Sequence, residues 1–339
     1  MRKFLPRMLA VALLLCVLIL SGCDVTSFDP NTGSPTIPFF DDQKFQVTFV
    51  YDNDTPDKTV LIEKGKTVAT PADPEKENYL FRGWYTDSAC THRYDFARSV
   101  TKDLTLYAKY EIDAITLTNK ITTDTVKGVV KVYNKNYNSF LGFETASATS
   151  QGSGFCFHIQ DGCYYILTNC HVAVKKAGYD HQQFTIEDYQ GKTYEGYLLK
   201  SANKAMNAIA AQYDLACLYF KPASATNVQA LSIVENDPEL GTDVISIGAP
   251  DGQANSITYG KIQDYGKVTV SDASASESDV TFDVIGHDAY INNGSSGGPL
   301  LDAQCNVIGV NYAGSKSANF SAAIPAEKVN EFLHTYVYG

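Results

Sequence analysis

The sequence has little of what helical bundles and nucleic-acid-binding proteins usually contain. Only three of its 339 residues are Met and one is Trp, whereas 24 Gly, 12 Pro and 22 Tyr favour many short strands joined by turns. Acidic residues outnumber basic residues by 38 to 27 and no basic run occurs, which argues against nucleic acid as a partner. Apolar residues make up 44% of the chain, which excludes a disordered protein. We therefore expect a globular, mainly β protein.

No apolar run is long enough to span a membrane as a helix, which requires about 20 residues. The run Met8–Leu20 has 13 residues, follows three basic residues within the first seven, and ends at small residues, as in a secretory signal. The sequence Leu20-Ser21-Gly22-Cys23 resembles a bacterial lipobox, in which cleavage before Cys23 leaves this cysteine to carry a lipid. An ordinary signal peptide followed by a chance cysteine is the alternative.

The length favours more than one domain, since a domain has about 150 residues. We expect a lipoprotein signal peptide at 1–22, a flexible tether at 23–43, a small module at 44–110, a linker at 111–127 and a larger domain at 128–339. The lipid would hold the protein on the extracytoplasmic face of a bacterial membrane, at the cell surface.

Six cysteines remain after the signal segment and Cys23 are set aside. They allow 15 pairings, among which the sequence alone does not choose. Cys156, Cys163 and Cys170 are seven residues apart, unlike the close pairs of zinc sites, so we expect neither a metal nor another cofactor.

The module at 44–110 alternates apolar and polar residues in Phe45–Phe49, as a half-buried strand does. The pieces F-R-G-W-Y at 81–85 and L-T-L-Y-A-K at 104–109 make residues 45–110 similar to the Listeria-Bacteroides surface repeat of the internalin B type. This resemblance implies a small β-grasp-like fold that acts as a spacer or adhesion module. Trp84 could stack on a ligand, but in so small a domain it is expected in the core.

Three residues of the larger domain carry a possible chemistry. His171 follows an apolar strand, Asp214 precedes another, and Ser296 lies among three glycines in Asn293–Leu300. An imidazole can take the proton of a serine hydroxyl when a buried carboxylate orients it. The backbone amides of Gly294 and Ser296 could bind the oxyanion of the transition state. Taken singly, each residue is more often a turn former or a structural residue.

Together these residues resemble the trypsin-like serine proteases, and most closely the HtrA (DegP-like) branch, over residues 128–339. The matching pieces are GSGF, YILTNCHV, DLACL, the run from His287 to Ala313, and NFSAAIP before a final helix. The resemblance implies two perpendicular six-stranded β-barrels and protein or peptide substrates. It implies His171 as general base, Asp214 as its orienting partner, Ser296 as nucleophile, and Gly294 with Ser296 as the oxyanion hole.

Two departures from the family pattern affect regulation. Ser295 stands where the digestive branch has an Asp that pairs with a newly cut N-terminus, so activation by such a cut is not expected. No PDZ domain is expected, because the chain ends at Gly339 soon after the final helix. The alternative function is a catalytically inactive, protease-like protein that binds a partner at the cell surface.

The residues just before the nucleophile form the wall of the primary pocket in this family. Tyr290 occupies the position where an acid would select Arg or Lys, and Ile291 follows it. We expect Tyr290 to shorten the pocket without pairing with a cation, which favours small or medium apolar P1 residues.

Overall fold

The computed structural model describes residues 43–201, 206–249, 255–270, 273–315 and 320–338. The expected signal segment, Cys23 and nearly all of the tether lie outside these residues. Within the described ranges, no helix combines the length and the apolar character needed to cross a bilayer. The chain divides into two compact units, one ending at Lys109 and the other comprising Pro74–Arg82 and the chain from Tyr110.

The first unit is built on a four-stranded sheet. Its order is β2 (Lys58–Glu63), β1 (Lys44–Val50), β4 (Leu104–Ile112) and β3 (Tyr79–Tyr85). Strand β1 runs antiparallel to β2 and parallel to β4. Its alternation puts Val47 and Phe49 inside, as the sequence pattern predicts.

Trp84 lies in the core of this sheet, which confirms the sequence-based expectation. Only 2% of its surface is exposed. The rings of Phe49 and Tyr51 meet it edge-on, with centroids 4.9 and 5.3 Å away. Because the side chain is buried, Trp84 does not form a surface platform for a ligand.

The segment expected as a linker contains a helix of the second unit. Helix α2 (Ala114–Thr123) begins at Asp113, whose side chain accepts the Thr116 amide, and the 3-10 turn η1 (Thr125–Gly128) follows. Leu117 and Ile121 lie one turn apart and are fully buried in the core of the larger domain. The segment 111–127 thus contains a packed helix, which the sequence did not reveal because a two-residue apolar stripe is too short to stand out.

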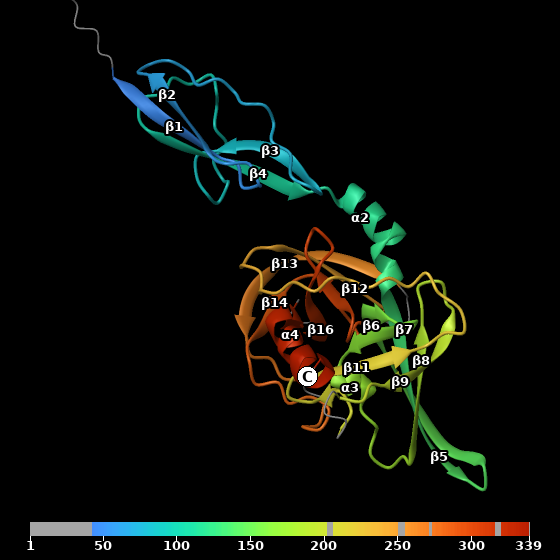
Figure 1. The fold of residues 1–339 in the computed structure, drawn as a ribbon. Coiled ribbons are helices and arrows are strands. Elements are labelled where there is room, and N and C mark those ends of the chain that lie inside the picture. The colour runs from blue at the N-terminus through green and yellow to red at the C-terminus, as the bar shows by residue number, and fades with distance from the viewer. Residues whose placement is uncertain (1–42, 202–205, 250–254, 271–272, 316–319, 339) are drawn as a thin grey trace, which may run out of the picture. The chain divides into compact units, whose positions relative to one another are not determined.

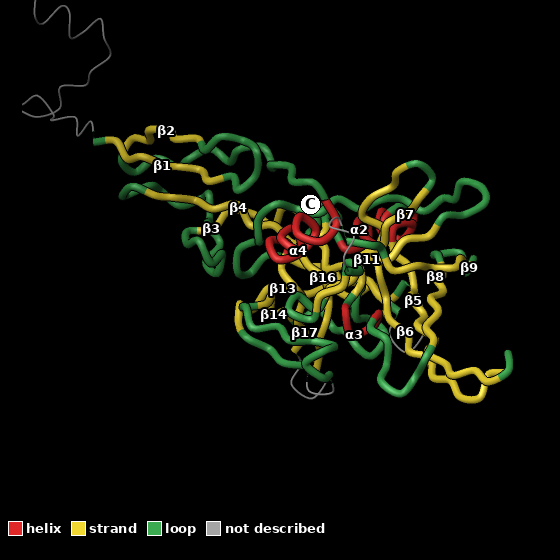
Figure 2. The backbone as a smooth tube through the Cα atoms, turned by 60° about the horizontal axis from the view of Figure 1, so that its bottom comes forward, coloured by secondary structure: helices red, strands yellow, loops and turns green. Residues whose placement is uncertain are grey.

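The second unit contains the two closed six-stranded barrels expected from the sequence (Figures 1 and 2). In the first barrel β11 also pairs with β9, which closes the sheet, and β10 (Ile209–Ala210) is added to β11. Its strands in order are β11 (Leu215–Phe220), β7 (Cys163–Thr168), β6 (Phe143–Gln160), β5 (Val129–Phe140), β8 (His181–Glu187) and β9 (Thr193–Leu198). The strands of the second barrel in order are β12 (Asp243–Gly248), β13 (Ser256–Gly266), β14 (Val284–His287), β17 (Phe320–Pro325), β16 (Val307–Ser315) and β15 (Pro299–Leu301).

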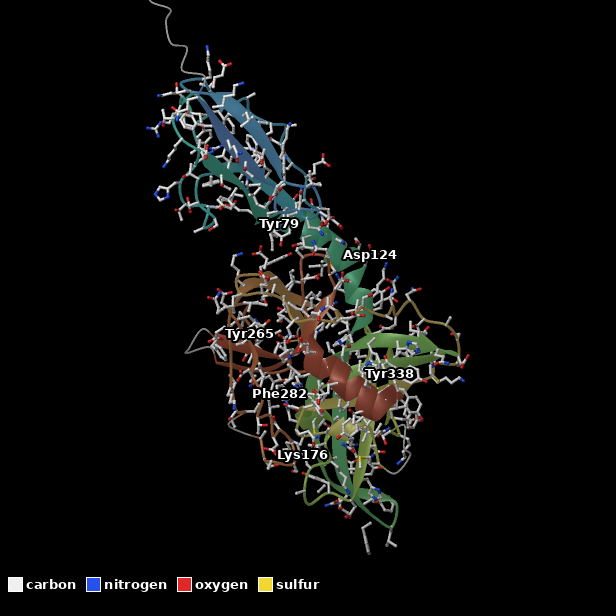
Figure 3. The ribbon with its side chains drawn as sticks, turned by 60° about the vertical axis from the view of Figure 1, so that its left-hand side comes forward. Tyr79, Asp124, Lys176, Tyr265, Phe282 and Tyr338 are labelled. Atoms are coloured by element: carbon white, nitrogen blue, oxygen red, sulfur yellow. The ribbon has the colours of Figure 1, made fainter. Side chains whose placement is uncertain are left out.

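The chain continues from the second barrel into the predicted final helix, α4 (Ala326–Leu333), followed by the π turn η3 (His334–Tyr338). Val329, Phe332 and Leu333 are buried, so the apolar stripe read from the sequence faces the core. Phe282 and Tyr338 lie beside this helix (Figure 3), and the ammonium of Lys328 sits over the Phe282 ring.

His287 is buried inside the second barrel at the end of β14. It has no exposed surface, and neither ring nitrogen has a hydrogen-bond partner among the described residues. Burial lowers the pKa of His287 to about 4 from 6.5, while the Asn311 side chain and the charge of Asp288 oppose this shift. The ring is therefore neutral in the folded protein at neutral pH.

We predict that His287 makes the fold sensitive to acid. Between about pH 6.5 and 4 the unfolded chain binds a proton that the folded chain does not, so stability falls as the pH falls. The loss should reach about 3 kcal/mol at pH 4. Urea unfolding of His287→Leu across this range should give a flatter profile than that of the parent, with exposed His158→Leu as the matched surface control. Equal slopes for His287→Leu and the parent would contradict this.

Candidate active site

The backbone around His171 is fixed by a short helical turn. Helix α3 (Cys170–Ala173) starts directly after β7, and Val174 closes it by donating to the Cys170 carbonyl. The side chain of Asn134, fully buried on β5, donates to the carbonyls of Val172 and Val174 at 2.8 and 3.0 Å. A buried amide thus holds the turn in place and determines where the His171 ring points.

Asp214 is fully buried and both of its carboxylate oxygens bind His171. Oδ2 lies 2.8 Å from His171 Nδ1, and Oδ1 accepts the His171 backbone N–H at 3.0 Å. The Asp214 carbonyl also accepts the Asn169 amide at 2.9 Å. Because Nδ1 donates to the carboxylate, the other ring nitrogen, Nε2, is left as a proton acceptor.

Ser296 lies in the loop between β14 and β15, and two glycines determine the path of this loop. Gly294 has φ +96 and Gly297 has φ +86, values in the left-handed region that favours glycine. A Cβ at Gly294 would lie 2.4 Å from the Ala249 carbonyl oxygen, and one at Gly297 would lie 2.1 Å from that of Ser153. The loop therefore requires glycine for space as well as for conformation.

Ser153 on β6 joins the first barrel to the nucleophile loop. Its N–H donates to the Ser296 carbonyl at 2.7 Å, and its hydroxyl donates to the Gly294 carbonyl at 2.7 Å. The same hydroxyl accepts the Ala249 N–H, and the Ser153 carbonyl accepts the Thr168 hydroxyl. The sequence showed Ser153 only as part of the GSGF motif, with no role assigned to it.

Asn311 on β16 holds the other end of the loop. Its carbonyl accepts the Gly297 N–H at 2.8 Å, and its side-chain amide donates to the carbonyls of Gly298 and Pro299. The residue is fully buried. Sequence reasoning missed it as well, although an Asn in the middle of an apolar strand is a signal of a buried polar partner.

The backbone amides of Gly294 and Ser296, unlike the carbonyls of the loop, have no hydrogen-bond partner in the described residues. Both belong to the same glycine-containing turn, next to the Ser296 side chain. Such a pair of free amides can bind a negatively charged oxygen.

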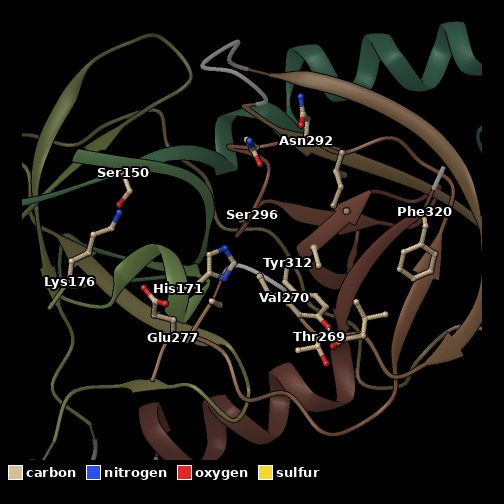
Figure 4. Close-up of a pocket in the computed structure, with 16 residues that line it drawn as sticks. Ser150, His171, Lys176, Thr269, Val270, Glu277, Asn292, Ser296, Tyr312 and Phe320 are labelled. Atoms are coloured by element: carbon tan, nitrogen blue, oxygen red, sulfur yellow. Dashed lines mark hydrogen bonds between the residues drawn. The ribbon is translucent and has the colours of Figure 1, made fainter. Parts of the chain in front are cut away.

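His171 and Ser296 both line a cleft of about 440 Å³. Figure 4 shows them facing the same space, with Lys176 and Glu277 on the His171 side. No hydrogen bond joins the His171 ring to the Ser296 hydroxyl among the described residues. The Ser274 N–H holds the pKa of the Glu277 carboxyl below its usual value, so this side of the cleft carries the negative charge of Glu277 beside the positive charge of Lys176.

The opposite side of the cleft is mostly apolar. Ile291 lines the cleft. Val270, Tyr312 and Phe320 lie across the cleft from His171 in Figure 4, and the other apolar residues of the lining are Val268, Ala273 and Ala313. No carboxylate other than that of Glu277 lines the cleft in the described ranges.

Tyr290 does not lie where the sequence reasoning placed it. It is 39% exposed and is absent from the cleft lining, while its neighbours Ala289 and Ile291 are buried. The Tyr290 side chain therefore does not reach the cleft. Its role as the pocket base is therefore corrected, and Ile291 is the member of the pair that reaches the cleft.

The described residues hold no group of three or more His, Cys, Asp or Glu side chains arranged for a metal ion. The six cysteines from Cys90 to Cys305 are free thiols. Burial raises the pKa of Cys170, next to His171, to about 12. This thiol therefore stays protonated and is not a competing nucleophile.

Comparisons with known proteins find similarity to two kinds of domain in this chain. Residues 152–310 match the model of a trypsin-like peptidase domain, and residues 45–109 match that of the Listeria-Bacteroides repeat domain. The chain is 33% identical over 194 residues to serine protease HTRA1 of Xenopus tropicalis, covering 56% of this chain and 37% of the relative. It is 30% identical over 207 residues to the chloroplastic Protease Do-like 5 of Arabidopsis thaliana, covering 58% of this chain and 60% of the relative.

Among solved structures, the active form of the Rv3671c protease from M. tuberculosis has the same fold. It superimposes with a TM-score of 0.50 and 22% identity, over 66% of this chain and 87% of that chain. The chain thus contains a trypsin-like peptidase domain homologous to the HtrA serine proteases, preceded by a Listeria-Bacteroides repeat domain.

Proposed function

We propose that the protein is a serine endopeptidase that cleaves peptide bonds through an acyl-enzyme. The observation that carries this proposal is the buried Asp214–His171 pair, which opens onto the same cleft as Ser296. His171 is the general base, Asp214 orients it, and Ser296 is the nucleophile. The HtrA relatives support protein or peptide substrates.

In the proposed reaction, His171 Nε2 takes the proton of Ser296 as the hydroxyl oxygen attacks the substrate carbonyl. The amides of Gly294 and Ser296 bind the resulting oxyanion. His171 then gives its proton to the leaving amine, and water hydrolyses the acyl-enzyme by the same route. The missing hydrogen bond between His171 and Ser296 is compatible with this path, because such contacts often tighten only when substrate binds.

The cleft wall supports a preference for apolar P1 residues. Ile291 packs against Gly314, since a Cβ added at Gly314 would lie 2.8 Å from Ile291 Cγ1. This contact narrows the apolar side of the cleft, and no carboxylate lies on that side in the described ranges. A P1 Arg or Lys would therefore lose its water without gaining an ionic partner.

We also infer that the protein is anchored at the extracytoplasmic face of a bacterial membrane by a lipid on Cys23. The lipobox-like sequence supports this anchor. The surface repeat at residues 45–109 supports a location at the cell surface. Proteolysis would then act on proteins at or near that surface.

Replacing the triad residues should abolish proteolysis. Ser296→Ala and Asp214→Asn should each lower kcat by about 10⁴-fold or more, because the three residues act as a unit. A fluorophosphonate probe should label the parent but not Ser296→Ala, whereas the matched control Ser295→Ala should still be labelled. A parent protein that the probe leaves unlabelled would refute the proposal and favour the inactive binding protein instead.

Specificity should follow Ile291 and not Tyr290. Cut sites in a denatured protein mixture should fall mainly after Val, Ala or Leu. Ile291→Ala should admit larger P1 side chains, because it removes the contact with Gly314. Tyr290→Ala is the neighbouring control and should leave the profile unchanged. A majority of cuts after Arg or Lys in the parent would rule this specificity out.

Cys23→Ala should release the protein from the membrane. The parent should partition into the detergent phase and incorporate a labelled lipid precursor, because acyl chains bury in the bilayer. The variant should do neither. If Cys23→Ala stays in the detergent phase with undiminished lipid labelling, the anchor lies elsewhere.

A further inference from the structure

Strands β5 and β6 form a ribbon that extends beyond the first barrel. They pair from Val129 opposite Phe155 to Phe140 opposite Phe143, with one register shift between Asn138 and Ser139. Strand β8 pairs with β5 only as far as Tyr137, and β7 pairs with β6 only from Phe155 onward. Residues 138–146 therefore form a two-stranded arm, which projects from the barrel in Figures 1 and 2.

The end of this arm is apolar and exposed. We call Phe140, Leu141 and Phe143 the hairpin tip; their exposed fractions are 69%, 81% and 76%. The turn between the strands consists of Leu141 at φ +49 and Gly142 at φ +82. Two-residue hairpin turns with positive φ normally take Asn or Asp at the first position. Neither burial within this domain nor the turn geometry explains a leucine at this position. We therefore infer that Leu141 contacts a surface outside this domain.

The arm next to the tip is polar but carries little charge. From Asn138 to Ser150 the only charged residue is Glu144, which forms an ion pair with Lys135 at 2.5 Å. The remaining residues of this stretch are mainly Ser, Thr, Ala and Asn. An apolar end could enter the acyl chains of a lipid surface, while the uncharged polar residues next to it would lie among the headgroups.

The size of the tip favours a bilayer over a protein partner. A stable protein interface buries about 800 Å² on each side, which three side chains at the end of a narrow arm do not provide. A bilayer needs no shape complementarity and accepts such side chains one at a time. The first 23 residues also resemble an export signal with a lipid site, which would bring the protein to a membrane.

We propose that the hairpin tip inserts into the outer part of a lipid bilayer. Ser150 lines the catalytic cleft and lies on the same strand, nine residues from Leu141. At about 3.3 Å per residue, the nine residues from Leu141 to Ser150 span about 30 Å. Insertion would then hold the cleft within about 30 Å of the bilayer, where it meets membrane-proximal segments of other proteins. This last consequence rests on the proposed protease function, but the insertion does not.

The test uses the full-length protein reconstituted in vesicles of phosphatidylcholine and phosphatidylglycerol. Trp84, the only tryptophan, is buried and gives a constant background. The tryptophan introduced by Phe140→Trp should shift to the blue and lose most of its emission to lipids with brominated acyl chains. Leu240→Trp is the matched control, because Leu240 is also exposed, at 62%, and it should show neither effect.

Adding Leu141→Asn and Phe143→Ser to Phe140→Trp should abolish the quenching. Leu141→Asn suits the turn, so loss of folding would not explain that result. The absence of quenching in Phe140→Trp itself would overturn the proposal. A second result would also overturn it and would indicate that the hairpin tip binds another copy of the chain. In that case the parent self-associates in sedimentation and Leu141→Asn is monomeric. The quenching in Phe140→Trp then equals that in Leu240→Trp. Fluorophosphonate labelling of Leu141→Asn should equal that of the parent, which separates this test from that of the protease function.

Discussion

The site depends first on the buried carboxylate of Asp214. A charge without contact to water is tolerated only when its oxygens are hydrogen-bonded, and removing one partner of such a buried pair costs about 3–5 kcal/mol. Here both oxygens bind one residue, through the ring and the backbone N–H of His171. The position of helix α3 and the direction of the imidazole are therefore coupled to the burial of a single charge at the start of β11.

The second constraint is that neither barrel forms the site alone. His171 and Asp214 follow and precede strands of the first barrel, whereas Ser296 lies on a loop of the second. Ser153 of the first barrel donates to two carbonyls of that loop, at Gly294 and Ser296. These buried hydrogen bonds connect residues more than 140 positions apart, so the relative position of base and nucleophile follows from how the barrels pack.

The sequence was sufficient for the barrels and for the pairing of His171 with Asp214, because short motifs in a fixed order carry both. It was insufficient where the outcome depends on a one-residue alternation or on distant partners. Tyr290 and Ile291 are adjacent, and only the burial of Ala289 and Ile291 decides which one faces the cleft. Ser153 and Asn311 bind carbonyls of a remote loop, which no local pattern encodes. Helix α2 escaped notice because its stripe, Leu117 and Ile121, is only one turn long.

The polar groups of the nucleophile loop divide in a way that bears on its chemistry. The carbonyls of Gly294, Ser295 and Ser296 each accept a hydrogen bond, from the Ser153 hydroxyl, the Gly298 amide and the Ser153 amide. The amides of Gly294 and Ser296 have no such partner in the described residues. Fixing the Ser295 carbonyl orients its peptide plane, and so it also orients the N–H of Ser296. Donors that are already aligned need no reorganisation when negative charge develops, which is the source of most electrostatic catalysis.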